Sequence, residues 1–157
     1  MASFLYHYIT KEKFMKALLL ILTLFVLDKG CSKSQINQEA ITLEYSAMSR
    51  GKFLEIKINK KNVLVKKNRN NTEDTSKTCT KNEWERLTKA LKNINIENIP
   101  HLKAPSNNRF FDGAAIANLT IIYEGNTYKS ESFDHGNPPK EIAQLVKEIL
   151  SISENIE

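Results

Sequence analysis

Beyond residue 40, apolar and polar residues alternate in three short runs, a pattern typical of strands that bury one face. Ile41, Leu43 and Tyr45 are the apolar positions of the first run, and the other two runs fall at 54–58 and 63–65. The connections between these runs are too short to cross over a sheet. We therefore predict three consecutive antiparallel strands.

A helix is predicted after residue 79, because Thr80-Lys81-Asn82-Glu83 has the sequence of a capping box. Its apolar stripe consists of Trp84, Leu87, Leu91 and Ile94. The polar stretch 66–78 before this helix could be a basic patch for a ligand, but Glu73 and Asp74 interrupt it and no aromatic residue is interleaved. We interpret this stretch as a solvated loop.

The last third of the chain predicts a hairpin and a second helix. Residues 114–123 form the most apolar strand, which we place centrally in the sheet. Gly125-Asn126 is a two-residue turn signal that leads into a strand over 127–133. Asn137-Pro138-Pro139 predicts the start of the final helix, with the asparagine as N-cap and a proline at the first position. The apolar stripe of that helix is Ile142, Leu145, Val146, Ile149 and Leu150.

These elements follow one another in the order βββαββα, and both helix stripes need a sheet face against which to bury. We therefore predict an α+β fold, with an antiparallel sheet of about five strands and two helices packed on one face. Residues 40–152 would form this fold as a single domain.

Composition supports one domain of ordinary character. The 157 residues are 41% hydrophobic and 26% charged, which excludes a long disordered chain and a protein with many membrane spans. Two cysteines are too few for a disulfide-dense scaffold or a four-cysteine zinc module. Four of the 23 basic residues lie in the first thirty positions, so the rest of the chain is weakly basic and gives no case for nucleic acid.

The N-terminus has the features of an export signal. Residues 17–27 are an apolar run of 11 with a single threonine, and Lys11, Lys13 and Lys16 precede it. A helix of that length covers only about half of a ~30 Å hydrocarbon layer, so it is too short for a stable anchor. Met15, directly before Lys16, would start a more compact signal and is an alternative start of translation.

The segment that follows, Leu27-Asp28-Lys29-Gly30-Cys31, resembles the end of bacterial lipoprotein signals, although Asp28 and Lys29 depart from the usual small or apolar residues. The resemblance implies a signal over 1–30, lipid on Cys31 and a polar tether over 31–39. Residues 40–150 also resemble, more weakly, small domains of envelope lipoproteins of Gram-negative bacteria. We therefore expect a protein of the Gram-negative cell envelope, held to a membrane through Cys31. This resemblance implies no catalytic activity.

Two alternatives to lipidation stay open. Cys31 could be incidental to an ordinary cleaved signal, in which case a Cys31–Cys79 disulfide could form in an oxidising compartment. The apolar run could also remain uncleaved as an anchor.

Most motifs of catalysis and metal binding are absent from the sequence, including Gly-x-Ser-x-Gly, His-Glu-x-x-His and Cys-x-x-Cys. We predict no cofactor, no metal site and no catalytic residue. Asp112, Asp134 and His135 keep one alternative open, a small envelope enzyme or a metal-dependent protein.

Two loops are candidates for a binding surface, residues 109–113 and residues 134–137. With Gly125-Asn126 as the turn, Asn118 lies opposite Phe133 and Ala115 lies opposite Gly136, so both loops emerge at the same end of the hairpin. The N-terminus of the final helix would add free N–H groups there. The side chains that we assign to this surface are Arg109, Phe110, Asp112, Asp134 and His135.

The favoured function is therefore a lipid-anchored binding or interaction module, with an envelope protein as a candidate partner. In this hypothesis Arg109 binds an anion or carboxylate, and Phe110 or Phe111 supplies apolar contact. The structural alternative is that Asp112 caps a helix or pairs with Arg109, and that the phenylalanine rings close the core.

Overall fold

Alternating apolar residues build a seven-stranded antiparallel sheet in the computed structural model, which describes residues 37–69 and 75–156. The strands in the described ranges are β1 (Ile41–Met48), β2 (Phe53–Asn59), β3 (Asn62–Lys66), β4 (Thr75–Thr78), β5 (Ile116–Tyr123), β6 (Asn126–Lys129) and β7 (Phe133–Asp134). Their order is β4-β3-β2-β1-β5-β6, and β7 also pairs with β5. The predicted signal, Cys31 and the tether up to residue 36 lie outside the described residues.

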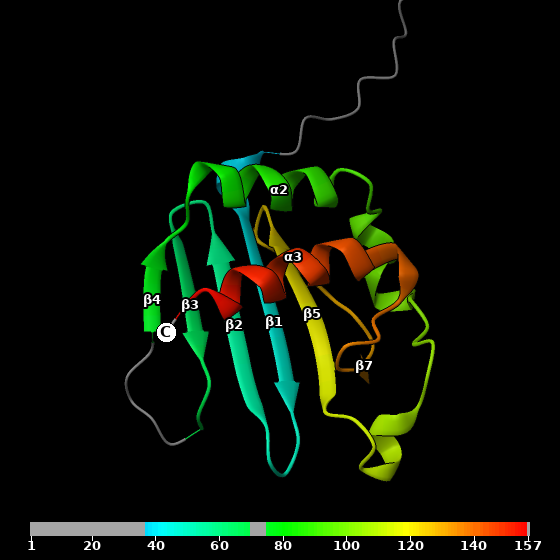
Figure 1. Ribbon diagram of the computed structural model, residues 1–157. Helices are drawn as coiled ribbons and strands as arrows, with labels where there is room; N and C mark the ends of the chain where they lie inside the picture. Colours follow the sequence, from blue (N-terminus) through cyan, green and yellow to red (C-terminus); the bar gives the residue numbers. More distant parts are fainter. Residues whose placement is uncertain (1–36, 70–74, 157) are drawn as a thin grey trace, which may run out of the picture. The chain divides into compact units, whose positions relative to one another are not determined.

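Two α-helices, α2 (Lys81–Leu91) and α3 (Ala143–Glu154), cover the same face of the sheet (Figure 1). The predicted α+β class, with an antiparallel sheet and two helices on one face, is confirmed. Four short 3₁₀ turns complete the described elements: η1 (Gln38–Ala40), η2 (Ile96–His101), η3 (Asn108–Phe111) and η4 (Lys140–Ile142). No helix among the described residues is long and apolar enough to cross a bilayer.

The core lies between the sheet and the helices. The apolar residues of the alternating runs form the sheet side of this core. Leu43 and Tyr45 of β1 are each 1% exposed, whereas Glu44 between them points to the uncovered face. Trp84 and Leu87 of α2 are buried on the helix side of this core. The predicted capping box is also confirmed, because the Thr80 side chain and the Glu83 backbone N–H are hydrogen-bonded, as are the Thr80 N–H and the Glu83 carboxylate.

The strand count is higher than predicted for two reasons. First, the end of the stretch expected to be a solvated loop pairs with β3 as β4, and Lys77 of this strand forms an ion pair with Glu83 at 2.6 Å. A short polar strand that carries a lysine is a usual way to protect a sheet edge. Second, the strand expected over 127–133 is interrupted and forms both β6 and β7.

The hairpin turn lies one residue earlier than predicted. Glu124 and Gly125 have positive φ angles of 49° and 80°, so they are the turn residues, and Tyr123 pairs with Asn126. Such a pair of positive φ angles matches the twist of a tight hairpin. One additional residue between β6 and β7 then shifts the register again, as in a β-bulge. Phe133 consequently lies opposite Ala117 rather than Asn118.

The final helix also begins later than predicted. Asn137 is not its N-cap, because α3 starts at Ala143 after η4. Pro139 has an extended backbone at φ −49° and ψ 141°. A residue that precedes proline is pushed away from the helical region, and both Asn137 and Pro138 precede a proline. The helix N-terminus therefore does not lie at the predicted loop pair.

Candidate functional site

Asp134 of β7 holds the loop 105–113 through both of its carboxylate oxygens. Its Oδ2 accepts hydrogen bonds from Ser106 Oγ at 2.6 Å and from the Asn108 backbone N–H at 2.8 Å. Its Oδ1 accepts from the backbone N–H and the guanidinium of Arg109, at 3.0 Å and 3.1 Å. The side chains of Asp134 and Arg109 are 2% and 7% exposed, so their ion pair is buried. The two loops that the sequence placed at one end of the hairpin do meet.

The hydrogen bonds keep the Asp134 carboxylate charged. Burial by itself would raise its pKa, because burial disfavours the charged form. The hydrogen bonds from Ser106, Arg109 and Asn108 outweigh burial and lower the pKa from 3.8 to about 2. Asp134 therefore acts as a fixed acceptor for this loop, and the carboxylate that Arg109 binds is the protein's own.

Phe110 and Phe111 project from this fixed loop into solvent, with exposed fractions of 65% and 83%. The alternative that these rings close the core is therefore wrong. The Arg109 guanidinium lies 4.2 Å from the centroid of the Phe110 ring, a cation–π contact that restricts the ring. The loop thus presents two aromatic side chains from a backbone that Asp134 holds in place.

Asp112 ends η3 in a left-handed conformation, with φ 57°, and its N–H donates to the Asn108 carbonyl. Its carboxylate lies 3.7 Å from the Arg50 guanidinium, so it does not pair with Arg109. The two side chains are 78% and 92% exposed, and an ion pair in water adds little stability. This contact nevertheless places the β1–β2 turn beside the loop 105–113.

His135 links the buried Tyr45 to Lys52 of the β1–β2 turn. Its Nδ1 lies 2.8 Å from the Tyr45 hydroxyl, and its Nε2 lies 2.5 Å from Lys52 Nζ. The Lys52 ammonium can only donate, so Nε2 accepts and the neutral ring carries its proton on Nδ1, which donates to the Tyr45 oxygen. Burial lowers the pKa of His135, and the positive charge of Lys52 lowers it further. Burial also raises the pKa of Tyr45.

The three residues of the enzyme alternative have separate partners. Asp134 binds the loop backbone and Arg109, Asp112 faces Arg50, and His135 bonds Tyr45 and Lys52. Within residues 37–69 and 75–156, no group of three or more His, Cys, Asp or Glu side chains is placed to hold a metal ion. This arrangement gives no support to joint chemistry by these three residues.

The lowered pKa of His135 predicts that the protein loses stability as the pH falls below 6.5. In the unfolded chain this histidine binds a proton near its ordinary pKa of 6.5, whereas in the folded chain it stays neutral to lower pH. The unfolded state therefore binds more protons in this window, and stability falls with pH down to the lowered pKa. Melting temperatures measured across this pH range should show the slope.

The variant His135→Gln tests whether His135 causes this slope, and His101→Gln is its matched control. The glutamine at 135 cannot titrate, so its slope below pH 6.5 should be smaller than in the unmodified chain. His101→Gln makes the same substitution at an exposed position outside the contact of His135 with Tyr45 and Lys52. An identical slope in all three proteins would contradict the assignment to His135.

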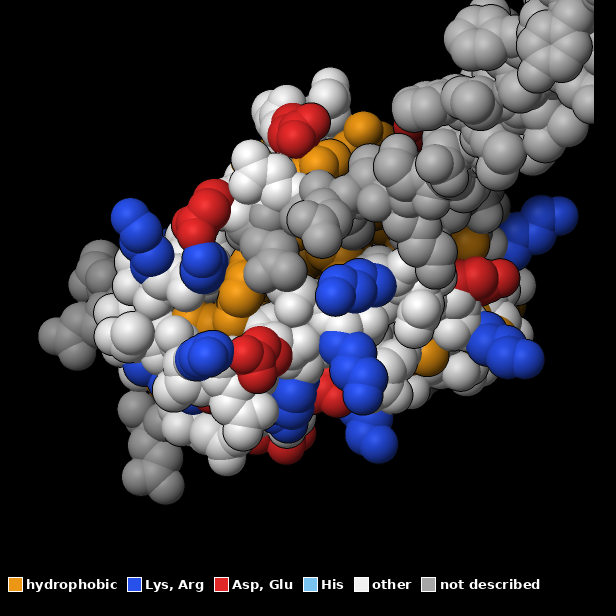
Figure 2. All heavy atoms as spheres, turned by 90° about the horizontal axis from the view of Figure 1, so that it is seen from above, with side chains coloured by type: hydrophobic (Ala, Val, Ile, Leu, Met, Phe, Trp, Pro, Cys, Tyr) orange, Lys and Arg blue, Asp and Glu red, His pale blue; other side chains and the backbone are white. Residues whose placement is uncertain are grey.

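Three segments meet at one end of the sheet, and we call them together the three-loop end: residues 49–52, 67–69 and 105–113. Figure 1 shows them at the lower end, opposite the point where residue 37 leads into β1. A recess of about 600 Å³ lies between the first two segments. Its lining includes Arg50, Lys52, Lys67 and Arg69, and none of its described lining residues is acidic. Figure 2 shows the molecule from the opposite end, where basic and acidic side chains lie side by side.

This basic recess was not predicted from the sequence. The aromatic ring that the stretch 66–78 lacks comes from the neighbouring strand, since the Arg69 guanidinium lies 5.7 Å from the centroid of the Phe53 ring. The signal was present in the predicted antiparallel pairing of 54–58 with 63–65. That pairing brings the residues before one strand beside the residues after the other.

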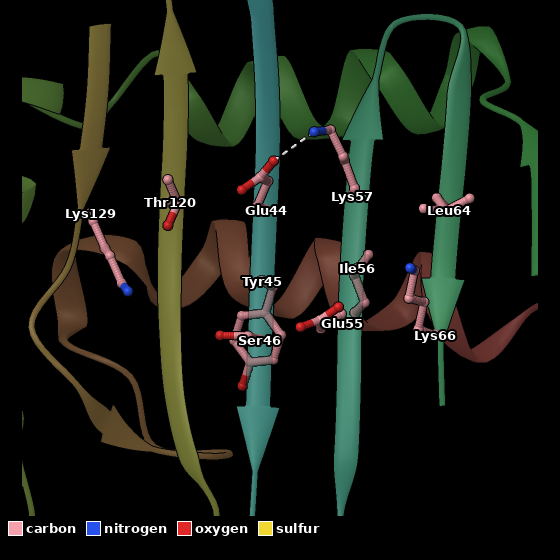
Figure 3. A pocket seen from close by; sticks show the side chains of 10 residues that line it. All are labelled: Glu44, Tyr45, Ser46, Glu55, Ile56, Lys57, Leu64, Lys66, Thr120 and Lys129. Atoms are coloured by element: carbon pink, nitrogen blue, oxygen red, sulfur yellow. Dashed lines mark ion pairs between the residues drawn. The ribbon is translucent and has the colours of Figure 1, made fainter. Parts of the chain in front are cut away.

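A second, smaller depression of about 380 Å³ lies on the uncovered face of the sheet (Figure 3). Glu44 and Lys57 on adjacent strands form an ion pair there at 2.8 Å. Glu55 lies opposite Lys66 in the register of β2 and β3. Charges of both signs alternate across neighbouring strands, as expected for a sheet face in water. We interpret this depression as a solvated surface.

Comparison of the chain with protein-family models and with curated proteins gives no match. The three-loop end, which the geometry of the chain's own residues defines, is the candidate functional site.

Proposed function

We propose that this protein is a lipid-anchored lipoprotein of the Gram-negative cell envelope and acts as a small binding module through its three-loop end. The observation that carries the binding role is the loop 105–113. Four hydrogen bonds to the buried Asp134 fix a loop whose most prominent side chains, Phe110 and Phe111, are left in solvent. A fixed loop with exposed aromatic rings is preorganised for contact, because little conformational entropy is lost on binding.

The direction of the chain supports the anchoring role. Residue 37 leads into β1 at the end of the sheet away from the three-loop end (Figure 1). A membrane attachment through Cys31, which precedes this point in the sequence, would leave the three-loop end accessible. The basic flank, the short apolar run and Gly30-Cys31 are the sequence features that favour lipid attachment.

Cell fractionation and mass spectrometry of the full chain in a Gram-negative host test the anchor. The unmodified protein should be found with membranes, and its N-terminal peptide should begin at Cys31 and carry lipid. Cys31→Ala should lose the lipid and leave the membrane fraction. Cys79→Ala is the matched control, because Cys79 is a buried thiol within the fold, and this variant should remain with membranes. An unmodified protein that is soluble in the periplasm, or that contains a Cys31–Cys79 disulfide, would contradict the anchor.

A further inference from the structure

The antiparallel sheet brings the apolar and basic groups of the three-loop end together. In such a sheet, β1 and β3 end where β2 and β5 start, so these four points lie at the same end of the sheet. Met48 lies opposite both Phe53 and Ile116, in one row on the uncovered face. Met48 and Ile116 are 38% and 46% exposed. The row and the exposed rings of Phe110 and Phe111 lie at the same end of the sheet, where Arg50 of the β1–β2 turn contacts Asp112 of the loop 105–113.

The basic groups of the recess flank this apolar surface. Arg50 contacts Asp112 on the phenylalanine loop, and Arg69 lies over Phe53. Lys52 is hydrogen-bonded to the neutral ring of His135, so this contact does not neutralise the charge of the lysine. Arginine and lysine beside exposed aromatic rings combine the two forces that hold a protein surface on anionic lipid, attraction to phosphate and burial of apolar area.

We propose that the three-loop end binds the surface of an anionic lipid bilayer other than the one that holds the anchor, with Phe110 and Phe111 in the headgroup layer and the basic recess on lipid phosphates. The proposal names the partner of the binding surface and so rests on the proposed function. Three loops that project from one sheet end can touch a flat surface at the same time (Figure 1). A peptide bound as a helix would need an apolar groove, whereas the described lining of the recess is mostly basic and polar. A peptide bound as a strand would need an open sheet edge, whereas β1, β2 and β5 are each paired on both sides. An acidic peptide held by the arginines is the competing partner, and the experiment below tests it.

The experiment uses the full chain with Cys31→Ala, so that no lipid is attached, and with Phe111→Trp as a fluorescent probe. The same chain without Phe111→Trp gives the background from Trp84, which is buried. Phosphatidylglycerol vesicles should shift the emission of the introduced indole to shorter wavelength, and lipids brominated on the acyl chain should quench it. Phosphatidylcholine vesicles should produce neither change. This readout is local to position 111 and does not depend on the anchor at Cys31.

Charge variants test the basic recess. Arg50→Ser with Arg69→Ser should weaken binding to phosphatidylglycerol vesicles roughly 30-fold, since each basic residue near an anionic surface contributes about a factor of five. Lys89→Ser with Lys92→Ser removes the same charge from exposed positions of α2 and the residue after it, and should leave binding unchanged. Equal losses in both double variants would show general charge attraction and overturn the proposal.

Three other results would also overturn it. An indole that stays in water in the presence of phosphatidylglycerol vesicles would exclude bilayer contact. Binding of soluble polyglutamate in place of vesicles would assign the surface to an acidic protein. Dimerisation that Phe111→Ser abolishes, measured by sedimentation, would assign it to a second copy of the chain. Failure of Cys31→Ala to leave membranes would count against the anchor alone, because the indole readout is made without it.

Discussion

Replacing Asp134 by alanine is expected to lower the melting temperature by roughly 10 °C or more. The variant leaves the Arg109 guanidinium buried without its carboxylate, and it removes the acceptor from the backbone N–H groups of Asn108 and Arg109. A buried charge without a partner is among the costliest defects that a fold can carry. Thermal unfolding followed by circular dichroism measures the effect.

Asp112→Ala is the matched control for this prediction. It removes a carboxylate from the same loop, but the Asp112 side chain is 78% exposed. Its ion-pair partner at 3.7 Å, the Arg50 guanidinium, is also exposed. Its melting temperature should change little, because exposed ion pairs contribute little stability. Equal shifts in Asp112→Ala and Asp134→Ala would contradict the structural role that we assign to Asp134.

Replacing Phe133 by alanine is expected to lower the free energy of unfolding by about 3–5 kcal/mol. Phe133 is fully buried, and its ring centroid lies 6.3 Å from that of Tyr45 in the core. The variant removes a large apolar side chain and leaves a cavity that close-packed neighbours fill only in part. Urea denaturation measures the free energy, and an unchanged m-value would show that the unfolded state is unaffected.

Phe111→Ala makes the same chemical change on the surface. Its side chain is 83% exposed, so its loss should change the free energy of unfolding by no more than about 0.5 kcal/mol. A stable Phe111→Ala protein that no longer binds anionic vesicles would separate the two roles of phenylalanine in this chain. If Phe111→Ala unfolds as readily as Phe133→Ala, the ring belongs to the core and the account of the loop is wrong.

The fold class followed from local patterns because each pattern has a direct physical cause. Alternation at Ile41, Leu43 and Tyr45 requires a strand with one buried face, and the spacing from Trp84 to Leu91 requires a helix with one buried stripe. The capping box fixed the start of α2, since Thr80 and Glu83 satisfy each other's backbone groups without help from distant residues. Predictions of this kind depend on neighbours within four residues.

The hairpin register required information that the pattern does not contain. Both Glu124-Gly125 and Gly125-Asn126 are plausible turns, and the choice shifts the pairing by one residue on each strand. The bulge before Phe133 then depends on Ser130, which pairs with Leu119 through both its backbone N–H and its hydroxyl. The start of α3 was missed because Asn137 donates to Ser106 in a distant loop instead of capping the helix.

In the candidate site, too, some features followed from the sequence and others depended on tertiary contacts. The sequence indicated that the loops around Arg109 and Asp134 lie together, because hairpin pairing alone brings them to one end. It did not indicate which acid would bind Arg109, because Asp112 is three residues away and Asp134 is twenty-five. Arg109 pairs with Asp134 because the fold buries this carboxylate beside Arg109, where two backbone N–H groups and a hydroxyl also donate to it.

The sequence by itself determined the α+β class, the buried faces of the main strands and helices, and the helix start at the capping box, because these depend on residue spacing and local hydrogen bonds. The tertiary structure decided which charges are neutralised and which side chains remain exposed. Arg109 is paired inside the protein and Arg50 is left in water, although both are arginines in short loops. That difference arises from strand pairing and burial, which join residues far apart in the chain.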